Sequence, residues 1–188
     1  METFETFIQR LALKLQERKP SHPPSQGRPA AVLIPFYEKD REPYLLLTKR
    51  TQTLPHHKGQ VCFPGGSQKD GEPLSVTALR ETHEELRISP EEVKILGPLE
   101  AIQTRNSGFL VTPFVGVLEK SPKVHPNPSE VAEVLSVPWS FLLNPLHLQE
   151  QTVESAGYTL LTPAYTYQTH IIWGLTVQII RRLIDLLE

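Results

Sequence analysis

Proline content restricts the fold of this chain more than any other feature of its sequence. Eighteen of the 188 residues are proline, which is nearly twice the usual share of about 5%. Because proline interrupts helix interiors and the hydrogen-bond ladders of central strands, we expect neither a helical bundle nor a coiled coil. The pattern instead predicts many short helices and strands that are separated by rigid turns.

Composition and length are those of an ordinary globular protein. The chain is 39% hydrophobic and 21% charged, has a net charge of −2 and contains one cysteine, Cys62. These values exclude a collagen, a disulfide scaffold and a cysteine-based zinc site, and they do not suggest a broad basic surface for nucleic acid. We therefore expect a single domain over residues 1–188 and no nucleic-acid partner. A lone cysteine fits a reducing compartment, so we expect a cytoplasmic protein.

A membrane association is not expected from the sequence. The first residues, METFETFIQR, lack the basic flank and the continuous apolar run of a signal peptide. No apolar run in the chain reaches the length of a spanning helix.

Hydrophobic periodicity predicts a mixed β-sheet that is covered by helices. Residues 3–17 and 169–187 have helical spacing of their apolar residues, including Ile171 and Ile172, and a Pro-rich linker extends from the first of these helices to residue 29. Strands are predicted at 30–37, 44–50, 93–102, 109–118 and 131–137, a helical turn at 138–143 and a hairpin at 151–167. Because these strands are not separated by regular helices, a doubly wound parallel sheet is not expected. Pro35 inside the first strand suggests a sheet edge or a bulge.

Residues 73–88 predict an amphipathic helix with a carboxylate cluster, and Pro73 suits its first turn. At 100° per residue three carboxylates fall within roughly 100° of arc: Glu81, Glu84 and Glu85. The opposite side carries apolar residues that should face the core: Val76, Leu79 and Leu86. Arg80 would relieve part of the repulsion in the cluster, whereas a divalent cation would relieve all of it. Oxygen ligands favour Mg²⁺ or Mn²⁺ over zinc.

The same spacing is also compatible with a solvated acidic face, since glutamate is common on exposed helices. The glycine pair before the helix, in FPGG at 63–66, favours the metal site, because glycine lets backbone approach a ligand closely. A free carbonyl in this turn would complete a set of oxygen ligands, although an ordinary tight turn has the same composition.

The stretch from residue 66 to residue 88 resembles the Nudix box, whose pattern is G-x5-E-x7-R-E-U-x-E-E-x-G-U with U an aliphatic residue. The matching positions are Gly66, Glu72, Arg80, Glu81, Glu84, Glu85 and Ile88. Thr82 stands in an aliphatic position, and Arg87 stands in the place of the last glycine. If that position requires a left-handed backbone, Arg87 costs about 1 kcal/mol.

This resemblance implies an α+β fold, the Nudix-type α/β/α sandwich with a mixed β-sheet, and hydrolysis of a nucleoside diphosphate that is linked to another group. It implies that the three box glutamates hold Mg²⁺ or Mn²⁺ together with the Gly65 carbonyl. Glu72 and Arg80 would orient the helix rather than touch the substrate. The general base stays open between a box glutamate, a distal-loop residue and a metal-bound water that needs no protein base. The candidates outside the box are Glu130, Glu133, Glu100 and Glu119.

The segment before the box, LLTKRTQTLPHHKGQVCFPGG at 46–66, resembles the additional signature of coenzyme A pyrophosphatases, LLTxR-[SA]-x3-R-x3-G-x3-FPGG. The matching positions are Leu46, Leu47, Thr48, Arg50, Gly59, Phe63, Pro64, Gly65 and Gly66. Thr51 stands in the serine or alanine position, and Pro55 stands where the signature has arginine.

A coenzyme A pocket needs cations for the 3′-phosphate and the diphosphate, and arginine binds phosphate in a bidentate manner. The candidate substrate-binding residues are Arg50, His56, His57, Lys58 and Gly66. Lys49 alternates with Arg50 along a strand, so only one of the two should face the site. Pro55 lacks the charge of the arginine that stands here in the signature. Either Lys58 or a histidine therefore makes the phosphate contact of that arginine, or the substrate has no 3′-phosphate.

The leading prediction is a Mg²⁺- or Mn²⁺-dependent pyrophosphatase that cleaves coenzyme A or acyl-CoA to 3′,5′-ADP and (acyl-)4′-phosphopantetheine. The alternatives are an enzyme that hydrolyses ADP-ribose or a dinucleotide, and a non-catalytic module that binds a nucleotide. The expected partner is a small-molecule nucleotide, and apolar surface on the terminal helices leaves a homodimer open.

Overall fold

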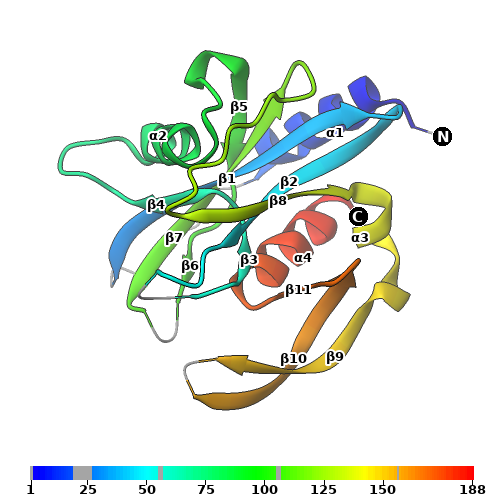
Figure 1. Cartoon of the computed structure of the whole chain (residues 1–188). Helices are drawn as coiled ribbons and strands as arrows, with labels where there is room; N and C mark the ends of the chain where they lie inside the picture. The colour runs from blue at the N-terminus through cyan, green and yellow to red at the C-terminus, as the bar shows by residue number, and fades with distance from the viewer. Residues whose placement is uncertain (1, 19–26, 55–56, 105–106, 156) are drawn as a thin grey trace.

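The computed structural model describes residues 2–18, 27–54, 57–104, 107–155 and 157–188 (Figure 1). Its helices are α1 (Phe4–Glu17), α2 (Leu74–Leu86), α3 (Trp139–Leu143) and α4 (Leu175–Leu187), with short 3-10 helices at Pro90–Glu92 and Pro145–His147. Its strands are β1 (Arg28–Lys39), β2 (Glu42–Arg50), β3 (Val61–Cys62), β4 (Gly65–Ser67), β5 (Val93–Pro98), β6 (Ile102–Gln103), β7 (Phe109–Leu118), β8 (Val131–Pro138), β9 (Leu148–Ser155), β10 (Tyr158–Tyr167) and β11 (His170–Trp173). Within these ranges no helix is both long and apolar enough to cross a membrane. Most of the predicted linker lies outside the described residues.

A mixed eight-stranded sheet forms the centre of the structure. Its main path is β3-β2-β1-β7-β5, and β4, β6 and β8 pair with β1, β7 and β2. The two central strands β1 and β7 run parallel, whereas the other pairings are antiparallel. A second sheet has the order β11-β10-β9, and its β9–β10 hairpin projects away from the body of the molecule (Figure 1).

Helices cover both faces of the large sheet. The buried apolar side chains form two clusters. The first cluster, which includes Phe7, Trp139 and Leu183, packs α1, α3 and α4 against one face, and the second, which includes Ala78 and Leu86, packs α2 against the other. Along β1, Ile34 and Phe36 belong to the first cluster, whereas Leu33 and Tyr37 belong to the second, as the alternation of a strand requires. This arrangement confirms the predicted α/β/α sandwich with a mixed sheet.

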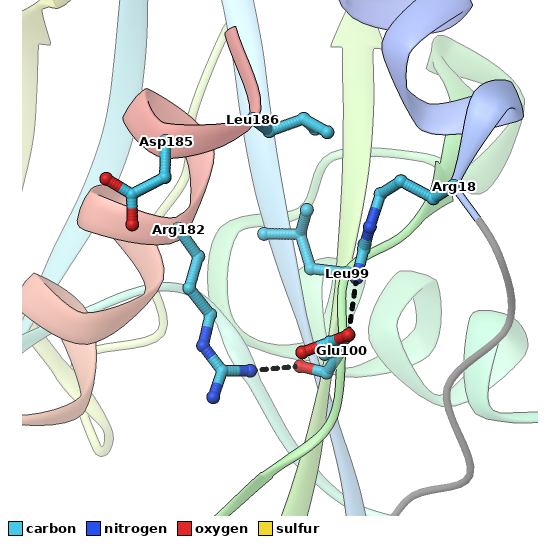
Figure 2. A pocket seen from close by; sticks show the side chains of 6 residues that line it. All are labelled: Arg18, Leu99, Glu100, Arg182, Asp185 and Leu186. Atoms are coloured by element: carbon cyan, nitrogen blue, oxygen red, sulfur yellow. Dashed lines mark hydrogen bonds and ion pairs between the residues drawn. The ribbon is translucent and has the colours of Figure 1, made fainter. Parts of the chain in front are cut away.

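Glu100 joins α1 and α4 to the connection between β5 and β6 (Figure 2). Arg18 forms an ion pair with its carboxylate (Nη2 to Oε1, 3.5 Å), and Arg182 donates from Nη1 to its backbone carbonyl at 3.0 Å. A hollow of about 210 Å³ between these side chains is floored by Leu99 and Leu186. Because α1 and α4 cover the face opposite α2, Glu100 and this hollow lie away from the acidic helix.

Pro35 lies in a central strand, so the prediction of a sheet edge or a bulge is wrong. β1 pairs with β4 through residues 30–32 and with β2 from Phe36 onward, which leaves a gap between the two ladders at Pro35. The N–H of Leu33 points to this side, toward the Pro64 carbonyl at 2.9 Å, and strand alternation directs the Pro35 nitrogen the same way. Its missing N–H therefore breaks no ladder bond.

The last predicted helix is wrong at its beginning. His170–Trp173 form strand β11, which pairs with β10, and the helix begins only after Gly174, whose φ is 64°. Ile172 is fully buried whereas Ile171 is 40% exposed, which is the alternation of a strand. A short apolar run is compatible with either structure, and here the pairing with β10 decides.

The buried side of α2 matches the predicted one only in part: Leu86 is fully buried and Leu79 packs against the same cluster, but Val76 is on the wrong side. Val76 is 46% exposed, whereas Thr77, Ala78 and Thr82 are fully buried against the sheet. The Thr82 hydroxyl donates to the Ala78 carbonyl at 2.7 Å. A threonine in the aliphatic position of the box therefore leaves no unsatisfied polar group in the core.

Helix α2 ends in a left-handed residue. Arg87 has φ 60° and ψ 25°, and its N–H donates to the His83 carbonyl at 2.9 Å. Replacing Arg87 by glycine is expected to raise the free energy of unfolding by about 1 kcal/mol, because glycine adopts this conformation without a Cβ clash. The Arg87 side chain is exposed, so little packing is lost.

Urea denaturation of Arg87→Gly beside Arg87→Ala measures this effect. Alanine also removes the charge but keeps the Cβ, so only the glycine variant should gain stability. Equal stability of the two variants would contradict the strain at this position.

Candidate active site

The turn before α2 brings backbone directly against the acidic helix. Strand β4 pairs with Ala31 and Val32 of β1. A Cβ at Gly65, whose φ is 153°, would overlap the Ala31 carbonyl and Val32, and a Cβ at Gly66 would overlap the carboxylate of Glu81. Gly65 therefore has no room for a side chain against the sheet, whereas a side chain at Gly66 would have to displace the Glu81 carboxylate.

Arg80 ties this turn to the helix. Its Nε and Nη2 donate to the two carboxylate oxygens of Glu72 at 2.8 and 3.0 Å, and Nη2 also donates to the Ser67 carbonyl at 3.0 Å. The Thr77 hydroxyl donates to Glu72 Oε2 at 2.8 Å. These hydrogen bonds, that of Arg80 above all, lower the pKa of Glu72 to about 2. The bidentate pair thus fixes the connection between β4 and α2.

Arg80 also neutralises two of the predicted metal-binding carboxylates. Its Nη1 donates to Glu81 Oε1 at 2.6 Å and to Glu84 Oε2 at 3.3 Å, and Lys69 Nζ pairs with Glu84 Oε1 at 3.3 Å. Desolvation opposes ionisation of Glu84, but the bonds from Arg80 and Lys69 outweigh it and lower its pKa. At Glu81, which is more buried, desolvation outweighs Arg80 and raises the pKa.

Glu85 is the most deeply buried carboxyl group of the box. Glu85 is only 2% exposed, and its Oε2 has no hydrogen-bond partner in the described part of the chain. Burial raises the pKa of Glu85 to about 8, against the opposing charge of Arg50, and the nearby carboxylates of Glu130 and Glu81 add to the rise. A buried oxygen without a partner beside two further acids is unfavourable unless a cation joins them.

These residues fit a divalent cation. Among residues whose placement is described, no three acidic, histidine or cysteine side chains already converge as a metal-binding group; Arg80 and Lys69 engage oxygens of Glu81 and Glu84. The unpartnered Glu85 oxygen and the raised pKa values of Glu81 and Glu85 are the features that a cation would relieve. Carboxylate oxygens are also the donors that hard divalent cations prefer.

The two predicted distal bases lie in different surroundings. The charge of Glu130 raises the pKa of both Glu81 and Glu85, so its carboxylate lies near theirs. Glu133 instead forms a hydrogen bond with His170 Nε2 at 3.1 Å and faces Lys49 Nζ at 3.9 Å. Of the two, only Glu130 shares the surroundings of the box carboxylates.

The predicted substrate-binding residues are only partly brought together. Arg50 lies near enough to Glu85 to lower its pKa, whereas its neighbour Lys49 pairs with Glu133, as strand alternation predicts. The Nε of Arg50 is buried without a hydrogen-bond partner among the described residues. His57 and Lys58 are exposed in the loop after β2, where His57 Nδ1 forms a hydrogen bond with Gln60 Oε1 at 2.9 Å. His56 and Pro55 lie outside the described residues.

Sequence reasoning missed the segment that covers the end of α2. The N–H of Asn127 donates to the Glu85 carbonyl at 2.8 Å, and the N–H of His125 donates to the Leu86 carbonyl at 2.9 Å. The prolines around these residues indicate a loop, but backbone bonds between distant segments leave no pattern of residue types that would reveal where the loop docks.

A family model and curated proteins both match this chain. The model described as the NUDIX domain matches residues 27–154. A protein of Photorhabdus laumondii named "Uncharacterized Nudix hydrolase NudL" is 40% identical over 184 residues, which are 97% of this chain and 97% of that protein. The protein of the same name from Pectobacterium atrosepticum is 41% identical over 184 residues, which are 94% of this chain and 91% of that protein.

Solved structures share the fold at low sequence identity. The NUDIX domain of Shewanella oneidensis NrtR, complexed with ADP ribose, has a TM-score of 0.55 at 17% identity and covers 94% of this chain and 98% of its own. DR0079 from Deinococcus radiodurans has a TM-score of 0.56 at 15% identity, with 88% and 90% covered. The family model and the curated relatives agree with this fold and with the carboxylates of α2. The chain therefore belongs to the Nudix hydrolase family, whose enzymes act on diphosphate bonds and generally use divalent metal ions.

Proposed function

We propose that this enzyme hydrolyses the diphosphate of coenzyme A or acyl-CoA with Mg²⁺ or Mn²⁺ and releases 3′,5′-ADP and (acyl-)4′-phosphopantetheine. The observation that carries the proposal is the contact between two sequence motifs. The FPGG turn, which ends the segment similar to the coenzyme A pyrophosphatase signature, lies against Glu81 and Glu85 of the box. This contact supports a single site that is formed by the segment similar to the signature and by the acidic helix.

Glu81, Glu85 and the Gly65 carbonyl would hold the metal ion, and Glu84 would join them when it exchanges Lys69 for the ion. When bound, the ion supplies charge neutralisation of the diphosphate and a lowered pKa for a water molecule. Glu72 and Arg80 do not need to touch substrate in this role, since they hold the turn and the helix together.

Glu130 would act as the general base. Its carboxylate lies near Glu81 and Glu85, whereas Glu81 and Glu84 are engaged by Arg80 and Glu85 is buried. A base must lie within hydrogen-bond reach of the water whose proton it accepts, and the loop that precedes β8 carries this carboxylate beside the acidic helix. Arg50 would balance the charge of the carboxylates, and the exposed His57 and Lys58 would meet the 3′-phosphate.

The 3′-phosphate of coenzyme A is expected to raise kcat/KM by at least about tenfold over dephospho-coenzyme A, the effect of one charged contact. Mass spectrometry of the products with Mg²⁺ and with Mn²⁺ measures both reactions. Lys58→Ala should lower the rate on coenzyme A and leave dephospho-coenzyme A unaffected. Equal rates on both substrates, or faster cleavage of ADP-ribose or a dinucleotide, would instead support the alternative that Pro55 favours.

Glu85→Gln is expected to lower kcat by about 10²-fold or more, because the variant loses a charged ligand of the metal. Circular dichroism should show an unchanged fold, since glutamine has nearly the same shape. Glu91→Gln, at an exposed position of the 3-10 helix after α2, is the matched control and should keep full activity. Full activity of Glu85→Gln would remove Glu85 from the metal site.

Without metal, Glu85 is expected to make the folded state less stable as pH rises from about 5 to 8. Its pKa is about 8 in the fold against 4.5 for the free group. Between these values the folded state binds a proton that the unfolded state has lost, so stability falls with pH. In thermal melts with a chelator, the melting temperature of Glu85→Gln should rise relative to that of the wild type as pH increases across this range. Added Mg²⁺ should make the wild type the more stable of the two. A constant difference would contradict this ionisation.

A further inference from the structure

Residues 124–130, called here the distal loop, are bound to α2 through backbone hydrogen bonds. The carbonyls of the last helical turn have no partner within a helix. Two of them are satisfied by the distal loop: Glu85 by the N–H of Asn127 at 2.8 Å, and Leu86 by the N–H of His125 at 2.9 Å. The loop is therefore held on the residue that carries a predicted metal-binding carboxylate.

The opposite side of the distal loop is bound to the end of β2. Thr51 is 8% exposed, and its N–H donates to the Glu130 carbonyl at 3.0 Å. Its hydroxyl donates to the Ser129 carbonyl at 3.2 Å. Thr51 belongs to the segment that resembles the coenzyme A pyrophosphatase signature, so the loop is held between that segment and the acidic helix.

The side-chain amide of Asn127 makes two kinds of contact. Its Oδ1 accepts from the N–H of Ser129 at 3.2 Å and from the Ser129 hydroxyl at 2.8 Å, which shapes the turn. Its Nδ2 donates to Glu130 Oε1 at 3.2 Å. One atom of the amide thus holds the loop, and the other holds the carboxylate of the proposed base.

We propose that Asn127 is a positioning residue that keeps the Glu130 carboxylate beside the metal-binding carboxylates of α2. The inference rests on the proposed function, in which Glu130 is the general base. Glu130 has a flexible side chain, which without a hydrogen-bond partner would also sample positions turned toward solvent. The hydrogen bond from Asn127 Nδ2 opposes that movement. Because the backbone N–H of Asn127 is itself bound to the Glu85 carbonyl, Glu130 is held relative to the helix residue that carries a metal-binding carboxylate.

A neutral donor suits this task better than a cation. Lysine or arginine at position 127 would also restrain the carboxylate, but it would hold the carboxylate in an ion pair and make it a weaker proton acceptor. The amide orients the carboxylate and adds no net charge to a site that must receive a cation and a polyanionic substrate.

Asn127→Asp separates positioning from loop structure, because aspartate keeps the Oδ1 acceptor but replaces the Nδ2 donor by a charged oxygen that repels the Glu130 carboxylate. We expect kcat to fall about tenfold or more with KM changed less than about twofold, as for a displaced catalytic group. Ser129→Ala is the matched control, since it removes one bond to Oδ1 and leaves Nδ2 on Glu130. It should keep kcat within about twofold of the wild type.

A double-mutant cycle tests whether Asn127 acts through Glu130. Once Glu130→Gln has lowered kcat, adding Asn127→Asp should change it by less than about twofold. If Asn127→Asp lowered kcat equally in the wild type and in Glu130→Gln, or left kcat unchanged in the wild type, Asn127 would not position Glu130. The assignment of Glu130 as the base would then still stand. Full activity of Glu130→Gln would overturn the assignment of the base and the inference with it. The kinetics are measured on whichever diphosphate the wild type hydrolyses.

Nuclear magnetic resonance of the metal-free protein supplies a readout without turnover. The side-chain amide resonances of Asn127 should move in Glu130→Gln, because a neutral group replaces the charged acceptor. They should stay in place in Glu91→Gln. Asn127 resonances that do not respond to Glu130→Gln would refute the hydrogen bond on which the inference depends.

Discussion

The guanidinium of Arg80 is the interaction on which the rest of the site depends. It meets Glu72, Glu81, Glu84 and the Ser67 carbonyl, so one positive charge serves three carboxylates and one turn. Without it, α2 would present an acidic face that repels itself, and the β4 turn would lose the bonds that Ser67 and Glu72 accept from Arg80. Glu85, which Arg80 does not reach with a hydrogen bond, keeps one buried oxygen without a hydrogen-bond partner among the described residues.

Helix α2 is held in its second half by one segment that precedes it and by one that is distant in sequence. The FPGG turn lies against Glu81 and Glu85, and the distal loop satisfies carbonyls of the last helical turn. Its buried side rests on the sheet through small and polar residues such as Ala78 and Thr82, which lets the helix approach β1 closely. The carboxylates are therefore placed by three separate contacts, and none of these depends on the long hydrophobic side chains that hold α1 and α4.

Much of the fold could be predicted from local pattern, and the errors lie where distant contacts decide. The periodicity of α1 and the hairpin of β1 and β2 follow from neighbouring residues. The exposure of Val76 does not, because the sheet packs on the face of Thr77 and Thr82. The strand at Ile171 does not either, because its pairing with β10 comes from elsewhere in the chain. In the site, the box spacing predicts which carboxylates share a helix face, whereas the backbone contacts of Asn127 have no local pattern.

The closeness of Gly66 to Glu81 also has an evolutionary consequence. Unlike Gly65, Gly66 has no positive φ, so its lack of a side chain answers the position of one carboxylate rather than a demand of the backbone. The length of residue 81 and the size of residue 66 are therefore a single steric variable that is shared by a strand and a helix. Any side chain at position 66 would have to displace the Glu81 carboxylate, which Arg80 holds at Oε1, so evolutionary change at position 66 is limited by the acid at position 81.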